Sequence, residues 1–284
     1  MRILIILTIS TLLSTQNFAH NIHNGGQLLQ KVSNFNEEAK LSDSELIQLA
    51  LEERMLSQRL AKNFILMGTE FSYKDVVEFE FESDMHTFEK NMQKLIKLSP
   101  DEEISMEYQK MKFIWSYYKQ ILKSKNVKST VPVVIDYSNR LLDATEYSIK
   151  LISKKTKVKR SKLMIAAGKC QMITQRIALL LLANKWEVRY DKMETLYDEN
   201  KQAFKKNLKY MYFNKGNTKG TKLYLKLIVN HFRHNKKDLV LDKLDDMSAD
   251  DIYILTQEVL DKLRLLEKLY SEMNKKRTKR IAVK

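Results

Sequence analysis

Two short segments repeat one pattern of arginine, glutamine and methionine, and the pattern holds the residues best suited to bind an anion. Segment 53–61 matches segment 170–178 at an offset of 117 residues, with Met, Gln, Arg and Ala at the same places. A guanidinium is planar and carries paired N–H donors, so it suits a planar oxyanion better than an ammonium does. The first copy holds Arg54 and Arg59; the second copy keeps the counterpart of Arg59, whereas the counterpart of Arg54 is the uncharged Gln171.

The positions that both copies share are expected to be structural. Residues five apart on a helix lie about 140° apart, so Arg59 cannot share a face with Arg54. We expect Arg59 and its counterpart Arg176 to make equivalent buried contacts, each with a carboxylate or a carbonyl of the bundle. The other shared motif positions are Met55, Gln58, Met172 and Gln175. We expect Cys170 to be a small buried residue, and the core to include Met55, Phe64, Met172, Tyr210 and Phe213.

The chain is poor in residues that interrupt helices, with only 6 Gly and 2 Pro among 284 residues. Strand-rich folds need many turns, which are built largely from such residues. A capping box places a helix start at Ser42 and Glu45, and a cap followed by Pro and acidic residues places another at Ser99–Glu103. Further breaks are expected at 126–132, 214–220 and 246–251. Apolar residues recur at three and four positions between the breaks, which predicts an all-α fold of eight helices.

Further matches extend the repeat over the helical region. Three pairs of segments match in order at nearly one offset: 53–61 with 170–178, 88–92 with 204–208, and 142–143 with 260–261. Such ordered matches indicate a duplication. We therefore predict two tandem four-helix bundles, at 41–153 and 154–274. Since 133–184 has no Pro and one Gly, a single long helix can join the units; a sharp turn near 154–159 is the alternative.

The ends of the chain differ from its helical centre. The first residues have a positive start, about a dozen apolar residues and a polar stretch that ends at Ala19. The apolar run is short against the roughly 20 residues of a membrane span, which favours a cleaved signal peptide over a retained anchor. We predict a signal peptide at 1–19, a linker at 20–40 and a basic tail at 275–284, with the mature protein in the periplasm.

The charge is strongly basic and unevenly spread. The chain has 50 Lys and Arg against 35 Asp and Glu, a formal net charge of +15. Residues 70–110 hold eleven acidic and five basic side chains, whereas 201–243 hold two acidic and twelve basic ones. One interpretation pairs the acidic and basic segments, within a chain or between two chains; the other leaves two solvated faces. Export and the lack of a base-reading motif argue against nucleic acid.

The repeated motif also carries a family resemblance. Arg54–Lys62 resembles the signature of the PilJ-type sensor domain of type IV pilus chemotaxis transducers, and it is similar to the first-helix box of the NarX-like nitrate-sensor kinases. Ala167–Lys169 resembles the Ala-Gly-Arg that often precedes that box. The resemblance implies a helical bundle, often dimeric, that holds a small ligand such as nitrate between two first helices. It gives the anion-contacting position to Arg54 and, in the second copy, to Gln171. One asymmetric site in a chain, or one shared by Arg54 of two chains, would follow.

Binding is favoured over catalysis. The chain has one Cys and five His, and it lacks a phosphate loop and a Ser-His-Asp order, so we predict no enzyme activity, no metal and no cofactor. We predict an exported periplasmic ligand-binding module of the sensor type, which takes a small anionic ligand and signals through a membrane receptor or another periplasmic protein, with a homodimer as one form. The alternatives are a structural or assembly protein of the periplasm and a binder of anionic membrane surfaces.

Overall fold

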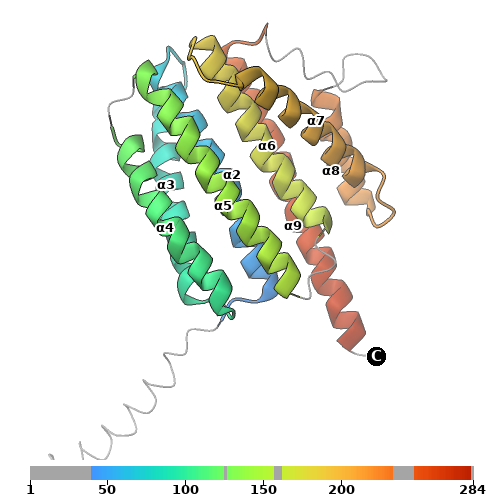
Figure 1. The fold of residues 1–284 in the computed structure, drawn as a ribbon. Helices are drawn as coiled ribbons and strands as arrows, with labels where there is room; N and C mark the ends of the chain where they lie inside the picture. The colour runs from blue at the N-terminus through green and yellow to red at the C-terminus, as the bar shows by residue number, and fades with distance from the viewer. Residues whose placement is uncertain (1–39, 125–126, 157–161, 233–245, 283–284) are drawn as a thin grey trace, which may run out of the picture. The chain divides into compact units, whose positions relative to one another are not determined.

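A computed structural model describes residues 40–124, 127–156, 162–232 and 246–282, and the described residues form eight α-helices and no strand (Figure 1). The helices are α2 (Asp43–Gly68), α3 (Lys74–Lys97), α4 (Glu102–Leu122), α5 (Val131–Lys155), α6 (Lys162–Lys185), α7 (Met193–Tyr212), α8 (Lys219–His231) and α9 (Ala249–Ala282), with a 3-10 turn η1 at Lys128–Thr130. The predicted all-α class is confirmed. The predicted leader 1–19 and residues 20–39 of the linker lie outside the described residues, and α9 continues through most of the expected tail.

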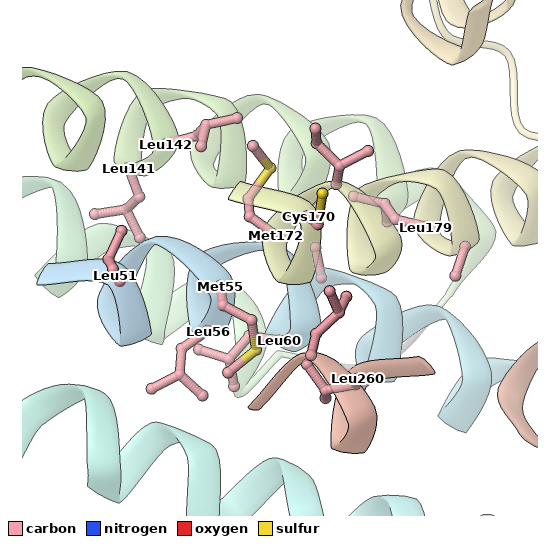
Figure 2. Packing of buried hydrophobic residues seen from close by; sticks show 14 of the residues in the cluster. Leu51, Met55, Leu56, Leu60, Leu141, Leu142, Cys170, Met172, Leu179 and Leu260 are labelled. Atoms are coloured by element: carbon pink, nitrogen blue, oxygen red, sulfur yellow. The ribbon is translucent and has the colours of Figure 1, made fainter. Parts of the chain in front are cut away.

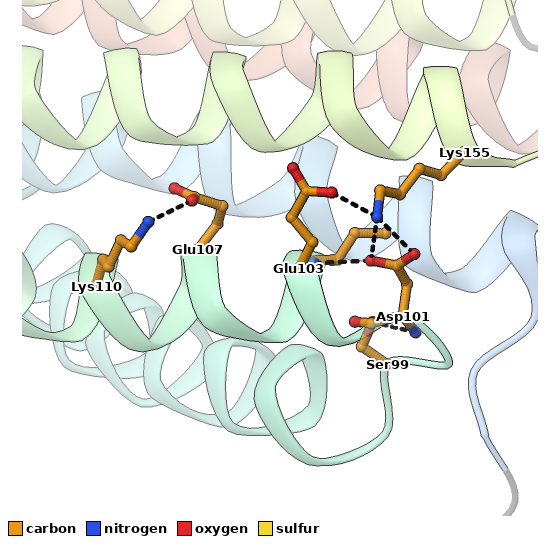
Figure 3. A network of polar contacts seen from close by, with 7 residues as sticks. Ser99, Asp101, Glu103, Glu107, Lys110 and Lys155 are labelled. Atoms are coloured by element: carbon orange, nitrogen blue, oxygen red, sulfur yellow. Dashed lines mark hydrogen bonds and ion pairs between the residues drawn. The ribbon is translucent and has the colours of Figure 1, made fainter.

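Both predicted helix starts are present, but the cap of α4 is Asp101 and not the residue before Pro100. Ser42 accepts a hydrogen bond from the backbone of Glu45, whose carboxylate accepts from the Ser42 N–H at 2.9 Å. Asp101 accepts from the N–H of Ile104 at 3.1 Å and so caps α4. Its carboxylate also accepts a hydrogen bond at 2.8 Å from Nζ of Lys155, which lies in the last turn of α5 (Figure 3). The start of α4 is therefore fixed to the end of α5.

The helices form two groups of four with the same order of neighbours. In the first group, α2 and α4 each pack against α3 and α5. In the second group, α6 and α8 each pack against α7 and α9. The first helices of the two groups, α2 and α6, pack against each other and join both groups into one compact unit, Leu41–Lys284. This arrangement is compatible with the predicted pair of four-helix bundles.

The expected long shared helix is absent, because two separate helices occupy this stretch, as the alternative requires. Helix α5 ends at Lys155, and its C-cap Thr156 has φ −94° and ψ 150°, which is extended backbone. A new helix, α6, begins at Lys162. Three lysines within 154–157 repel one another in a continuing helix, and α6 must reverse direction to lie beside α2.

The central helices α2 and α6 are buried on every side. Each residue from Glu53 to Leu66 and from Cys170 to Ala183 is buried, and Figure 2 shows apolar side chains of both segments in one cluster. Among the described residues only α6 is long and apolar enough to cross a membrane. In its 18-residue apolar segment, 89% is buried inside the protein, as in a core helix. A Cβ on Gly168 would lie 3.1 Å from Leu51 side-chain atoms, so glycine permits the close approach of the pair.

Candidate functional site

Arg54 lies inside the protein and already has an anionic partner. Its side chain is 1% exposed, and its Nη1 donates to Glu146 Oε1 of α5 at 3.0 Å. Its Nη2 donates to the carbonyl of Ile165 in α6 at 3.4 Å. Burial lowers the pKa of Arg54, although the Glu146 carboxylate opposes that shift. An anion at Arg54 must compete with Glu146, and a site shared by Arg54 of two chains would require the bundle to open.

Gln171 makes the corresponding contact in the second group of helices. Its Nε2 donates to Glu267 Oε2 of α9 at 2.5 Å, so each first helix donates to a glutamate on the fourth helix of its own group. The two partners differ in register. The match of 142–143 with 260–261 aligns Glu146 with Arg264, and Glu267 lies three residues further, about one turn along α9. Thus the arginine near these glutamates lies on the first helix in one group (Arg54 of α2) and on the fourth helix in the other (Arg264 of α9).

The loss of a first-helix arginine leaves Glu267 without a strong charged partner. Burial raises the pKa of Glu267 to about 7, while the hydrogen bond from Gln171 and the more distant Arg54 charge oppose the shift. Glu267 therefore titrates near neutral pH, unlike an ordinary glutamate.

Arg59 and Arg176 are both buried, as expected, but their contacts are not equivalent. Arg59, 8% exposed, forms a two-pronged ion pair with Asp84 of α3. Arg176, 7% exposed, donates instead to Gln58 Oε1 of α2 at 3.0 Å and Asn139 Oδ1 of α5 at 2.6 Å. The prediction of equivalent contacts is therefore wrong.

The physical reason is a missing carboxylate. The match of 88–92 with 204–208 aligns Asp84 with Asn200, which donates to a carbonyl of its own helix. Arg176 has no acidic partner there and reaches across to the first group. Both amide atoms of Gln58 are therefore hydrogen-bonded, since its Oε1 accepts from Arg176 and its Nε2 donates to the Ser138 carbonyl at 2.9 Å. Its counterpart Gln175 is fully buried, with neither amide atom hydrogen-bonded to a described residue.

A groove of about 490 Å³ lies where α2, α6 and α9 meet. Gln171 lines this groove, whereas Arg54 is not among its lining residues. The other polar lining residues are Gln48, Glu52, Arg264, Glu267, Lys268, Ser271 and Glu272. Both signs of charge thus face one space beside the junction of the two helix groups. Within the described chain, no set of three or more His, Cys, Asp or Glu is arranged to hold a metal ion.

The groove residues on α9 were missed from the sequence. Arg264, Glu267 and Lys268 have the spacing of a solvated helix face, and only the packing of α9 on α6 turns them toward α2. The one sequence signal was the alignment of Arg264 with Glu146. Buried Glu53 and Lys62 on α2 were also missed, since charged residues are rarely found fully buried.

The predicted core residues fall into two classes. Met55, Phe64, Met172 and Cys170 are buried, which confirms the prediction for them. Tyr210 and Phe213 are instead 44% and 70% exposed, so their assignment to the core is wrong. Only Phe204, Leu208 and Met211 form the buried face of α7. Tyr210 is next to that face, and Phe213 follows the last residue of the helix.

Comparison with known proteins gives no match among family models, curated proteins or solved structures. The PilJ-type resemblance therefore depends on the motif of α2 and its second copy in α6.

Proposed function

We propose that this chain is a ligand-binding helical module of the sensor type, without enzyme activity, and that its ligand occupies the groove between α2, α6 and α9. The observation that carries the proposal is the mixed-charge lining of that groove beside the central helix pair. Ligand sites are commonly concave and have a few convergent polar groups. The groove includes Gln171, which the family resemblance associates with ligand binding.

The lining favours a ligand that carries both charges. Arg264 and Lys268 can receive a carboxylate or another planar oxyanion, and the guanidinium can do so with paired donors. Glu52 and Glu272 repel a bare anion but can bind an ammonium group, and Glu267 does the same in its ionised form. A small zwitterion such as an amino acid therefore matches the lining better than nitrate does. Nitrate binding at Arg54 stays a prediction, and it is tested in the same experiment.

Ligand binding here can act on the helix packing. The lining residues lie on a first helix of each group and on α9, so a ligand that contacts all three changes the relative stability of their arrangements. The long α9 then offers a route to a partner protein. Export to the periplasm is part of the proposal, and a mature N-terminus at His20, measured by mass spectrometry of exported protein, is the expected result.

The test is a thermal-shift screen followed by calorimetry on the full chain, with amino acids, nitrate and nitrite as probes. A ligand at 100 times its dissociation constant should add about 2.7 kcal/mol of stability. Arg264→Met should remove the response to a carboxylate-bearing ligand. Arg140→Met, at an exposed arginine of α5 outside the groove, is the matched control and should keep it. Arg54→Ala should remove a nitrate response only if nitrate binds at Arg54. No response to any probe at millimolar concentration, or equal losses in both arginine variants, would overturn the groove assignment.

A further inference from the structure

The end of α7, the loop after it and α8 make up what we call the α7–α8 surface, and this segment itself contains no acidic residue. Residues 200–231 contain eight lysines and no Asp, Glu or Arg. Six of the lysines are exposed: Lys206, Lys209, Lys215, Lys219, Lys222 and Lys226. These lysines belong to the basic segment 201–243, which the sequence analysis compares with the acidic segment 70–110.

Aromatic rings are exposed among these lysines. Phe213 is 70% exposed and packs edge-on against Tyr212, and Tyr210 is 44% exposed. Phe213, Tyr210 and Lys209 line one shallow hollow with Lys206 and Lys215. The hollow is therefore both apolar and cationic.

The backbone under this surface is fixed. Asn217 Nδ2 donates to the Met211 carbonyl at 2.7 Å and caps the end of α7. Tyr270 of α9 donates to Asn217 Oδ1 at 2.9 Å, which ties the loop to the core. The chain thus presents Phe213 at the surface in a defined place, and does not fold it under the helix.

We propose that this α7–α8 surface docks on an anionic phospholipid bilayer, with the lysines at the phosphate groups and Phe213 among the upper acyl chains. Lysine ammonium groups act as point charges that suit a surface of many phosphates, whereas recognition of one carboxylate favours the paired donors of arginine. An exposed aromatic ring between cations gains from insertion at the interface between water and lipid. The proposal is independent of the ligand groove, which α2, α6 and α9 form.

The experiment is co-sedimentation of the full chain with vesicles of pure phosphatidylcholine and vesicles that contain 30% phosphatidylglycerol. Binding should require the anionic lipid and weaken as salt rises. Each lysine near such a surface is worth about 1 kcal/mol, or about fivefold in partition. Lys206→Gln, Lys209→Gln and Lys215→Gln together should then weaken partition about 100-fold. Phe213→Ala should weaken it several-fold.

The chain provides matched controls on its first four helices. Phe113 of α4 is 73% exposed, close to the 70% of Phe213, so Phe113→Ala should leave partition unchanged. The triple change of exposed Lys90, Lys94 and Lys112 to Gln removes the same net charge elsewhere and should have a much smaller effect than the α7 triple. Equal losses from both triples, no binding to anionic vesicles, or binding to polyglutamate but not to vesicles would overturn the proposal.

Discussion

Replacement of Glu267 by glutamine should stabilise the protein at pH 8 and leave its stability unchanged near pH 4.5. Glu267 has a pKa of about 7 in the folded protein, mainly because of burial, against an ordinary value of 4.5. Between these values the folded state holds a proton that the unfolded state has lost. Stability therefore falls as the pH rises from 4.5 to 7, because the folded state binds more protons in that window.

The size of the effect follows from the same shift. The full shift corresponds to about 3 kcal/mol above pH 7. Glu267 also lines an open groove, where solvent screens its charge, so we expect about 1 to 2 kcal/mol. Glutamine retains the shape and can still pair with Gln171. Denaturant unfolding at pH 4.5, 6 and 8 measures the difference between the two proteins.

Glu146→Gln is the matched control, and it should destabilise the protein, whereas Glu267→Gln should stabilise it at pH 8. Glu146 is the partner of Arg54, and Glu146→Gln leaves a buried guanidinium without its carboxylate. Loss of one partner of such a pair costs about 3 kcal/mol when both are buried, and less here because Glu146 is 26% exposed. If Glu267→Gln has one effect at all three pH values, or both variants lose stability alike at pH 8, the assignment of unequal partners in the two helix groups is refuted.

Three further changes test the central helices by denaturant unfolding. Burial lowers the pKa of Lys62 to about 7, so between pH 7 and about pH 10 the unfolded state binds more protons than the folded state. The stability of the wild-type protein should therefore rise with pH over this range. Lys62→Met should abolish this rise and increase the free energy of unfolding by about 2 kcal/mol at pH 7. Asp84→Asn should cost about 3 kcal/mol by leaving Arg59 buried beside a neutral group, whereas joint Asp84→Leu and Arg59→Met should cost much less. Gly168→Val should cost about 2 kcal/mol by overpacking against Leu51, and Gly168→Ala less, because alanine favours the helix by about 1 kcal/mol; equal costs would contradict the close approach.

The local signals of the sequence were sufficient for the fold class. The capping box at Ser42 depends on residues within one turn, so it could be predicted without knowledge of the packing, whereas the cap of α4 lies at Asp101, two residues after the predicted one. The break after α5 was left open, because Gly and Pro are absent there and helix propensity alone permits continuation. Tyr210 and Phe213 were misassigned because aromatic residues are core residues in most helices, and only the rotation of α7 about its axis decides which side they take.

The site could be predicted only in part, because the repeat shows which residues differ between the two copies but not which residues they contact. The motif on α2 and α6 marks Arg54 and Gln171, but their partners lie on α5 and α9, far away in the sequence. The difference between Arg54 and Gln171 changes where the charges around the motif lie. With arginine on the first helix, the charge pair closes within the bundle; with glutamine there and Arg264 on α9, both charges line a groove. Under the proposed function, the first group therefore stays closed and the groove beside the second group holds the ligand.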